Sequence, residues 1–66
     1  MDIETQIKTE LKNQRLNQLK RRYFELELDR VGLEANGDIN GVEAIVKRMD
    51  TVQKAYDAVN AIDTGE

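Results

Sequence analysis

The sequence predicts an all-α fold: an antiparallel hairpin of two helices that dimerises into a four-helix bundle. Apolar residues recur in steps of three and four in both halves of the chain, which is the spacing of one helix face. Proline is absent, so neither half contains a forced break. Two glycines and two asparagines fall together in residues 36–41, where a turn can form. At 66 residues the chain has room for a single domain, covering residues 1–66.

Helix 1 is expected from about residue 2 to residue 35. Its main apolar stripe consists of Leu16, Leu19, Tyr23, Leu26 and Leu33. Arg30 fills the gap in this stripe. We expect its aliphatic stem to pack, with its charged head reaching Asp50, Glu43 or a carboxylate of another subunit. An anion-binding role for Arg30 is the alternative.

The turn is expected over residues 36–40. Glycine readily takes the left-handed conformation that ends a helix, so Asn36 and Gly37 predict the end of helix 1. Asn40 followed by Glu43 predicts a capping box at the start of helix 2. Helix 2 is then expected from about residue 41 to residue 62.

The same turn partly matches the calcium-binding loop of an EF-hand. Asn36, Asp38, Asn40 and Gly41 occupy loop positions 1, 3, 5 and 6. Position 12, which requires a bidentate glutamate, is Lys47. A lysine in place of the strongest ligand argues against calcium. We therefore interpret the loop as structural and expect no metal site.

Helix 2 carries an unbroken heptad stripe that predicts its partner. The stripe consists of Val42, Ile45, Met49, Val52, Tyr56 and Val59. If the chain reverses at the turn, the numbers of facing residues should total about 75, so that Leu26 meets Met49 and Leu16 meets Val59. The two stripes then match along their length, which favours an antiparallel hairpin.

Two apolar surfaces have no counterpart in such a hairpin. One consists of Phe24, Leu28 and Val31, which a lone hairpin would leave in water. The other consists of Ile3, Ile7 and Leu11, in a segment beyond the end of helix 2. Residues 1–12 either form a helical arm that docks on a second subunit, bend near Asn13, or form a frayed tail. We assign both surfaces to self-association or to a partner interface.

Charge is unevenly distributed. The net charge is −3, yet residues 1–22 hold six basic groups against three acids. This asymmetry favours association between opposite ends of two chains. A basic face is a candidate contact for nucleic acid or an acidic partner, and it consists of Lys8, Lys12, Arg15, Lys20, Arg21 and Arg22. The acidic remainder and the lack of a known reader motif make nucleic acid the weaker alternative.

Several functions are disfavoured by composition. Histidine and cysteine are absent, and no glycine-rich phosphate loop occurs, so we expect no enzyme, catalytic residue or cofactor. The chain has no membrane-length apolar run, and its lack of cysteine suits the cytoplasm. The leading hypothesis is a small homo-oligomer, with a dimer favoured, that acts through protein–protein interaction as an adaptor, assembly factor or regulator of a larger protein partner. The alternative is a nucleic-acid-associated regulator using the basic face of residues 8–22.

Overall fold

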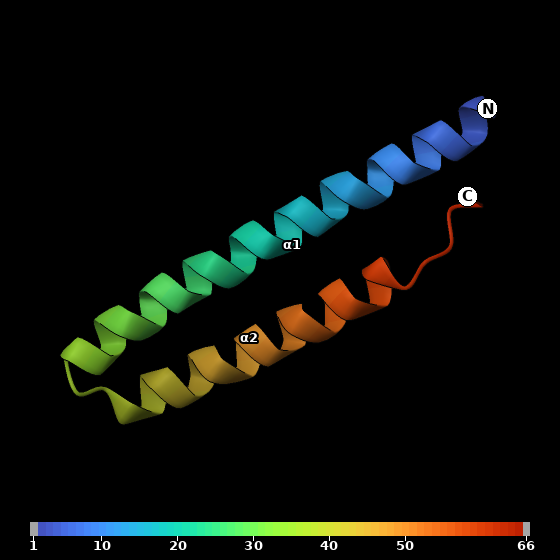
Figure 1. Ribbon diagram of the computed structural model, residues 1–66. Coiled ribbons are helices and arrows are strands. Elements are labelled where there is room, and N and C mark those ends of the chain that lie inside the picture. The colour runs from blue at the N-terminus through green and yellow to red at the C-terminus, as the bar shows by residue number, and fades with distance from the viewer. Residues whose placement is uncertain (1, 66) are drawn as a thin grey trace.

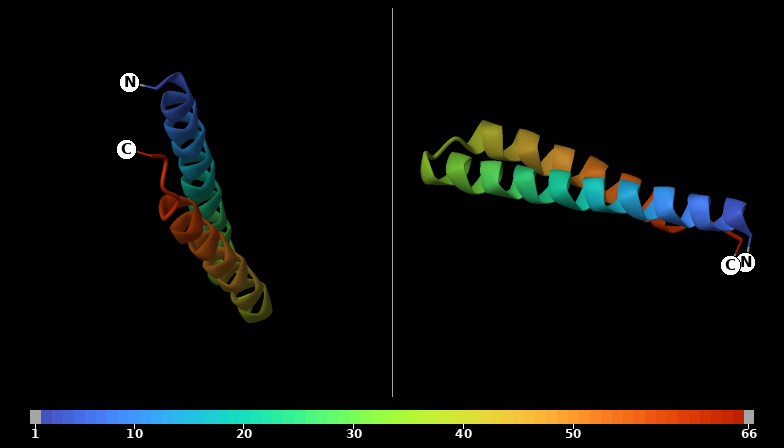
Figure 2. Two further views of the ribbon diagram at one scale, coloured as in Figure 1. Left: turned by 90° about the vertical axis from the view of Figure 1, so that its right-hand side faces the viewer. Right: turned by 90° about the horizontal axis from the view of Figure 1, so that it is seen from above.

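The computed structural model describes residues 2–65 and contains two α-helices. Helix α1 spans Ile3–Ala35 and helix α2 spans Ile39–Asn60. They run antiparallel and side by side, with the first turn of α1 and residues 61–65 at the same end (Figure 1). The backbone extends 53 × 15 × 10 Å, so the molecule is a single layer of two helices. The two views in Figure 2 show the same arrangement. The expected all-helical hairpin is confirmed.

The two helices meet along a seam that repeats every seven residues. The buried side chains of this seam are Leu16, Met49 and Val52. The buried and half-buried residues of α1 are Thr5, Thr9, Lys12, Leu16, Leu19, Leu26, Glu27, Arg30 and Leu33. Apart from Glu27, these residues follow one another in steps of three and four, with the exposed Tyr23 at the position between Leu19 and Leu26. The heptad pattern therefore fixed the face that α1 presents to α2.

The predicted register is also confirmed by contacts across the seam. The Lys12 ammonium donates a hydrogen bond to the carbonyl oxygen of Ile62 at 2.8 Å. The Lys20 ammonium lies 5.8 Å from the centre of the Tyr56 ring. These pairs, 12 with 62 and 20 with 56, total 74 and 76, close to the expected 75.

Helix α1 ends as the sequence predicts. Gly37 has a φ of 70°, the left-handed conformation that few other residues adopt without strain. The Gly37 amide donates to the carbonyl of Glu34, and the Asp38 amide donates to the carbonyl of Leu33, both at 3.0 Å. This pair of bonds is a Schellman motif, which satisfies carbonyls at the helix terminus.

The start of α2 differs from the expectation. Helix α2 begins at Ile39, two residues earlier than predicted, and the turn is limited to residues 36–38. Asp38 is the N-cap, and its carboxylate accepts a hydrogen bond from the Gly41 amide at 2.9 Å. The predicted capping box of Asn40 and Glu43 was wrong, because Asn40 already lies inside the helix. A carboxylate at the cap also interacts favourably with the helix dipole.

The end of α2 is also earlier than predicted. The helix stops at Asn60 rather than near residue 62, and the Ile62 amide donates to the carbonyl of Val59 as the chain leaves the helix. The departing segment turns toward α1, where Lys12 holds it by the bond to Ile62. Residues 3–12 are helical and continuous with α1. Residues 61–65 therefore extend the hairpin along the first turns of α1 (Figure 1).

Two glycines allow a test of the turn. Gly41 packs closely: a Cβ there would lie 2.6 Å from the Asp38 carboxylate and 3.1 Å from a Leu33 methyl. Gly32 has open space around its Cβ position. Gly41→Ala should displace the cap and lower the free energy of unfolding by about 1 kcal/mol. Gly32→Ala should raise it by about 0.5–1 kcal/mol, because alanine favours helix.

Thermal unfolding followed by circular dichroism at 222 nm measures both variants. A change of about 1 kcal/mol moves the Tm of a domain this small by roughly 4–8 °C. We expect the Tm of Gly41→Ala to be lower than that of the natural protein and the Tm of Gly32→Ala to be higher. Equal stabilisation by both substitutions would show that the Asp38 cap tolerates a side chain at Gly41.

Candidate interaction surface

The face of α1 that points away from α2 carries large exposed apolar side chains. The residues concerned are 49% to 72% exposed and comprise Ile3, Ile7, Leu11, Phe24, Leu28 and Val31. Ile3 and Phe24 are 21 residues apart, and so are Ile7 and Leu28. Because the seam repeats every seven residues, this separation of three heptads places both pairs on one line opposite the seam. Apart from Leu11, which lines a hollow with Val59 and Ile62, the two apolar surfaces expected from the sequence therefore belong to one helix face.

We call this surface the outer face of α1 and define its central line by two sets of heptad positions. The first set is Ile3, Glu10, Asn17, Phe24 and Val31. The second set is Ile7, Gln14, Arg21 and Leu28. All nine side chains are exposed. The face is thus apolar at both ends and polar in the middle, which sequence reasoning missed because it treated the two ends separately.

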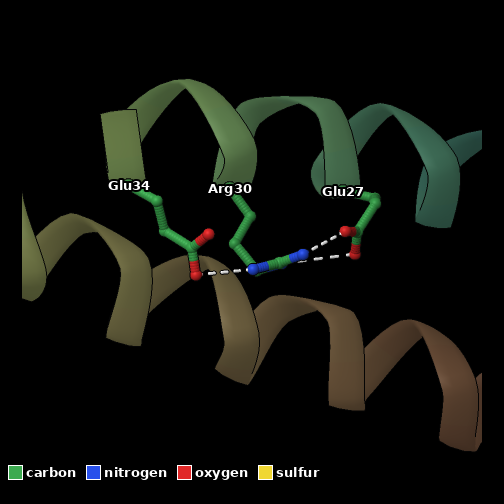
Figure 3. A network of polar contacts seen from close by, with 3 residues as sticks. All are labelled: Glu27, Arg30 and Glu34. Carbon is green, nitrogen blue, oxygen red and sulfur yellow. Dashed lines mark hydrogen bonds and ion pairs between the residues drawn. The ribbon is translucent and has the colours of Figure 1, made fainter. Parts of the chain in front are cut away.

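Arg30 interacts with its own helix. Its guanidinium pairs with the carboxylate of Glu27 and with the carboxylate of Glu34, the latter at 2.6 Å. Figure 3 shows the charged group lying along α1 between the two acids. The expected partners were Asp50 and Glu43, but acids three residues before and four after an arginine lie within easier reach. Asp50 instead pairs with Lys54 at 3.1 Å.

The ion pair shifts the ionisation of its members. Hydrogen bonds from Arg30 hold the pKa of the Glu27 carboxyl below its ordinary value, with partial burial opposing the shift. The same bonds raise the pKa of the Arg30 guanidinium. Arg30 lies in a hollow beside Tyr23 and Val46, so its stem does pack against the hairpin. Arg30 thus packs near the turn end of the seam, while its charged group is paired with two acids of its own helix.

The basic residues do not form a single surface. Lys8, Arg15 and Arg22 are spaced by seven residues, so they follow one flank of the seam. Lys8, Lys12 and Arg15 line a hollow with the segment after α2. Lys20 lies over Tyr56 on the opposite flank. Arg21 belongs to the outer face, and the six predicted residues are therefore divided among three directions.

One basic residue of this flank escaped the sequence analysis. Arg48 of α2 lines the same hollow as Arg22. It lies 26 residues further along the chain, in a mainly acidic stretch, so a search for basic runs passes over it. The pairing rule could have found it, because Arg48 faces the part of α1 one turn beyond Arg22. The basic flank thus consists of Lys8, Lys12, Arg15, Arg22 and Arg48.

Other kinds of site find little support in residues 2–65. Among these residues, no three acidic side chains gather where they could hold a metal ion. Within the same range, neither helix is long and apolar enough to cross a membrane. Searches of protein-family models, curated proteins and solved structures returned no match. The outer face of α1 and the basic flank remain as the two candidate interaction surfaces.

The shifted pKa of Glu27 leads to a prediction about pH. A carboxyl whose pKa is lowered on folding stabilises the protein above its unfolded pKa, and this contribution disappears as the pH falls through the folded pKa. Glu27→Gln should therefore reduce the Tm at pH 7 and leave it nearly unchanged at pH 2. Glu25→Gln is the control, because Glu25 forms no ion pair with another described residue.

Melting curves from pH 7 to pH 2 compare the three proteins. The difference between the natural protein and Glu27→Gln should shrink steadily below about pH 4.5. A difference that is constant over this range would mean that Glu27 acts through packing rather than through its charge.

Proposed function

We propose that this protein is a small self-associating helical protein that acts through protein–protein interaction, as an adaptor, assembly factor or regulator of a larger partner. In this proposal the chain works as a dimer of four helices in the cytoplasm. The observation that supports it is the outer face of α1, where two clusters of apolar side chains stay half exposed or more in the hairpin. Monomeric proteins rarely expose aligned apolar clusters of this kind without a binding role.

The energetics of the hairpin favour association. Within residues 2–65 the buried apolar side chains are limited to Leu16, Met49 and Val52. A chain of this length buries only about 60% of the surface that its unfolded form exposes, and it has no disulfide to compensate. Covering a half-exposed side chain such as Phe24 or Leu28 contributes roughly 1 kcal/mol or more. Association through the outer face would therefore stabilise both the complex and the hairpin itself.

Self-association is tested with a charge placed in the outer face. Phe24 is 62% exposed, so Phe24→Glu should leave the seam intact while disrupting association. Sedimentation equilibrium should show the natural chain as a dimer at micromolar concentration, and Phe24→Glu as a monomer. Ile39→Glu is the matched control, since Ile39 is 72% exposed on α2 and lies outside the outer face.

Circular dichroism separates dissociation from unfolding. Phe24→Glu should keep most of its helical signal at high protein concentration. A natural chain that is monomeric at micromolar concentration with full helicity would overturn self-association. If Phe24→Glu and Ile39→Glu dissociate the dimer equally, the outer face is not the interface.

A second candidate function, binding of nucleic acid, is favoured by one observation. The basic flank gathers side chains from both helices, and Arg15, Arg22 and Arg48 form no ion pair with any described residue. Arginines without carboxylate partners are available for phosphate groups. In this candidate, the hairpin would bind the backbone of DNA or RNA along one flank.

A salt titration tests the second candidate. Affinity for a DNA duplex should fall by about 0.9 log units per log unit of salt for each phosphate neutralised. The double variant Arg22→Gln with Arg48→Gln should reduce that slope by about two. Lys54→Gln is the control, because Lys54 already pairs with Asp50. Absence of DNA and RNA binding at about 50 mM salt, where electrostatic attraction is strong, would exclude this function.

A further inference from the structure

We propose that the partner of the outer face is a second copy of this chain, packed antiparallel so that the numbers of facing α1 residues total 31. The inference rests on the proposed self-association and specifies its geometry. A two-fold axis would pass between residues 15 and 16 of the two α1 helices. The two copies of α2 would then lie on the outside, because the outer face points away from the seam.

The pattern of the outer face leads to this arrangement. In an antiparallel pair of helices with a heptad period, each of the two stripe positions faces the other position on the partner. A two-fold axis also requires that if residue i contacts residue j, then j contacts i. A total of 31 satisfies both conditions. The facing pairs, each present twice, are Ile3 with Leu28, Ile7 with Phe24, Glu10 with Arg21, and Gln14 with Asn17.

Every pair in this register joins side chains of matching chemistry. The apolar end of one α1 covers the apolar end of the other, since Ile3 and Ile7 meet Leu28 and Phe24. The polar middle of each face meets the polar middle of its partner. Apolar side chains are thus withdrawn from water without burying a polar group against them. Val31, one turn beyond Leu28, extends each apolar cluster.

The charges in the polar middle are complementary. Glu10 and Arg21 are both exposed, and neither forms an ion pair with another residue in the range 2–65. In the proposed register each Glu10 meets the Arg21 of the other copy, giving two symmetric ion pairs. Such pairs mainly fix register and orientation, while apolar contacts supply most of the affinity.

Neighbouring registers are less compatible. A shift of one heptad to a total of 38 would place Glu10 against Leu28 and Phe24 against Gln14. A shift to a total of 24 would place Ile3 against Arg21 and Ile7 against Asn17. A parallel pair would bring Glu10 against Glu10 and Arg21 against Arg21. Of these four arrangements, the antiparallel pair with a total of 31 is the one in which apolar residues face apolar residues and opposite charges face each other.

Charge reversal tests the register. Glu10→Arg alone and Arg21→Glu alone should each weaken dimerisation by roughly tenfold in Kd, because each turns two attractions into two repulsions. The double variant Glu10→Arg with Arg21→Glu should recover the natural Kd within about twofold. Both positions are exposed on α1, so circular dichroism of each variant should show unchanged helicity.

The possible results separate this inference from the proposed function. Weaker dimerisation of the single variants, with the natural Kd recovered in the double variant, supports the register. If all three variants dimerise with the natural Kd, or if the double variant does not recover that Kd, the register is overturned and self-association still stands. A monomeric natural chain overturns both.

Disulfide formation gives a second measurement that does not depend on charge. The chain has no cysteine, so introduced thiols would be the reactive pair. A mixture of Ile3→Cys and Leu28→Cys chains should form a mixed disulfide dimer under mild oxidation. Each variant alone should form far less. Lys54→Cys mixed with Leu28→Cys is the control and should not crosslink.

The crosslinking pattern also identifies the alternatives. Efficient crosslinking of Ile3→Cys with itself would indicate parallel helices and overturn the antiparallel arrangement. Crosslinking of Leu28→Cys with itself would do the same.

Discussion

The rest of this structure depends on the heptad seam between α1 and α2. Leu16, Met49 and Val52 are its buried centre, and the half-buried residues on either side follow the same seven-residue period. An isolated helix in water is marginal, so neither element would persist without the other. The seam also decides the functional surfaces. Once one side of α1 is committed to α2, the opposite side becomes the outer face and one flank becomes the basic flank.

Much of the fold follows from the sequence because its information is periodic. The steps of three and four from Leu16 to Leu33 and from Val42 to Val59 identify one face on each helix. The tight turn at Gly37 then leaves few ways to pair them. The same logic gave the register that the Lys12 and Lys20 contacts confirm. Period and turn length are enough for an antiparallel hairpin, since its contacts are arranged as a single ladder.

Details that depend on competition between near-equal neighbours were harder to predict. Asp38 and Asn40 are both good cap residues, and local rules do not separate them. The close approach of Gly41 to Asp38 and Leu33 favours the cap at Asp38, and only the packed turn shows it. Arg30 likewise had acids on both helices within reach, and those on its own helix were nearer. The basic run was divided because consecutive helical residues point in different directions.

The seam itself changes character along its length. Its apolar positions run from Leu16 to the turn, whereas the first places on α1 are Thr5, Thr9 and Lys12, opposite the extended segment 61–65. The closed end is held by packing and by the Schellman motif, and the open end by polar contacts. Opening should therefore begin at the termini and proceed toward the turn, so that amide hydrogen exchange is fastest in the first three turns of α1.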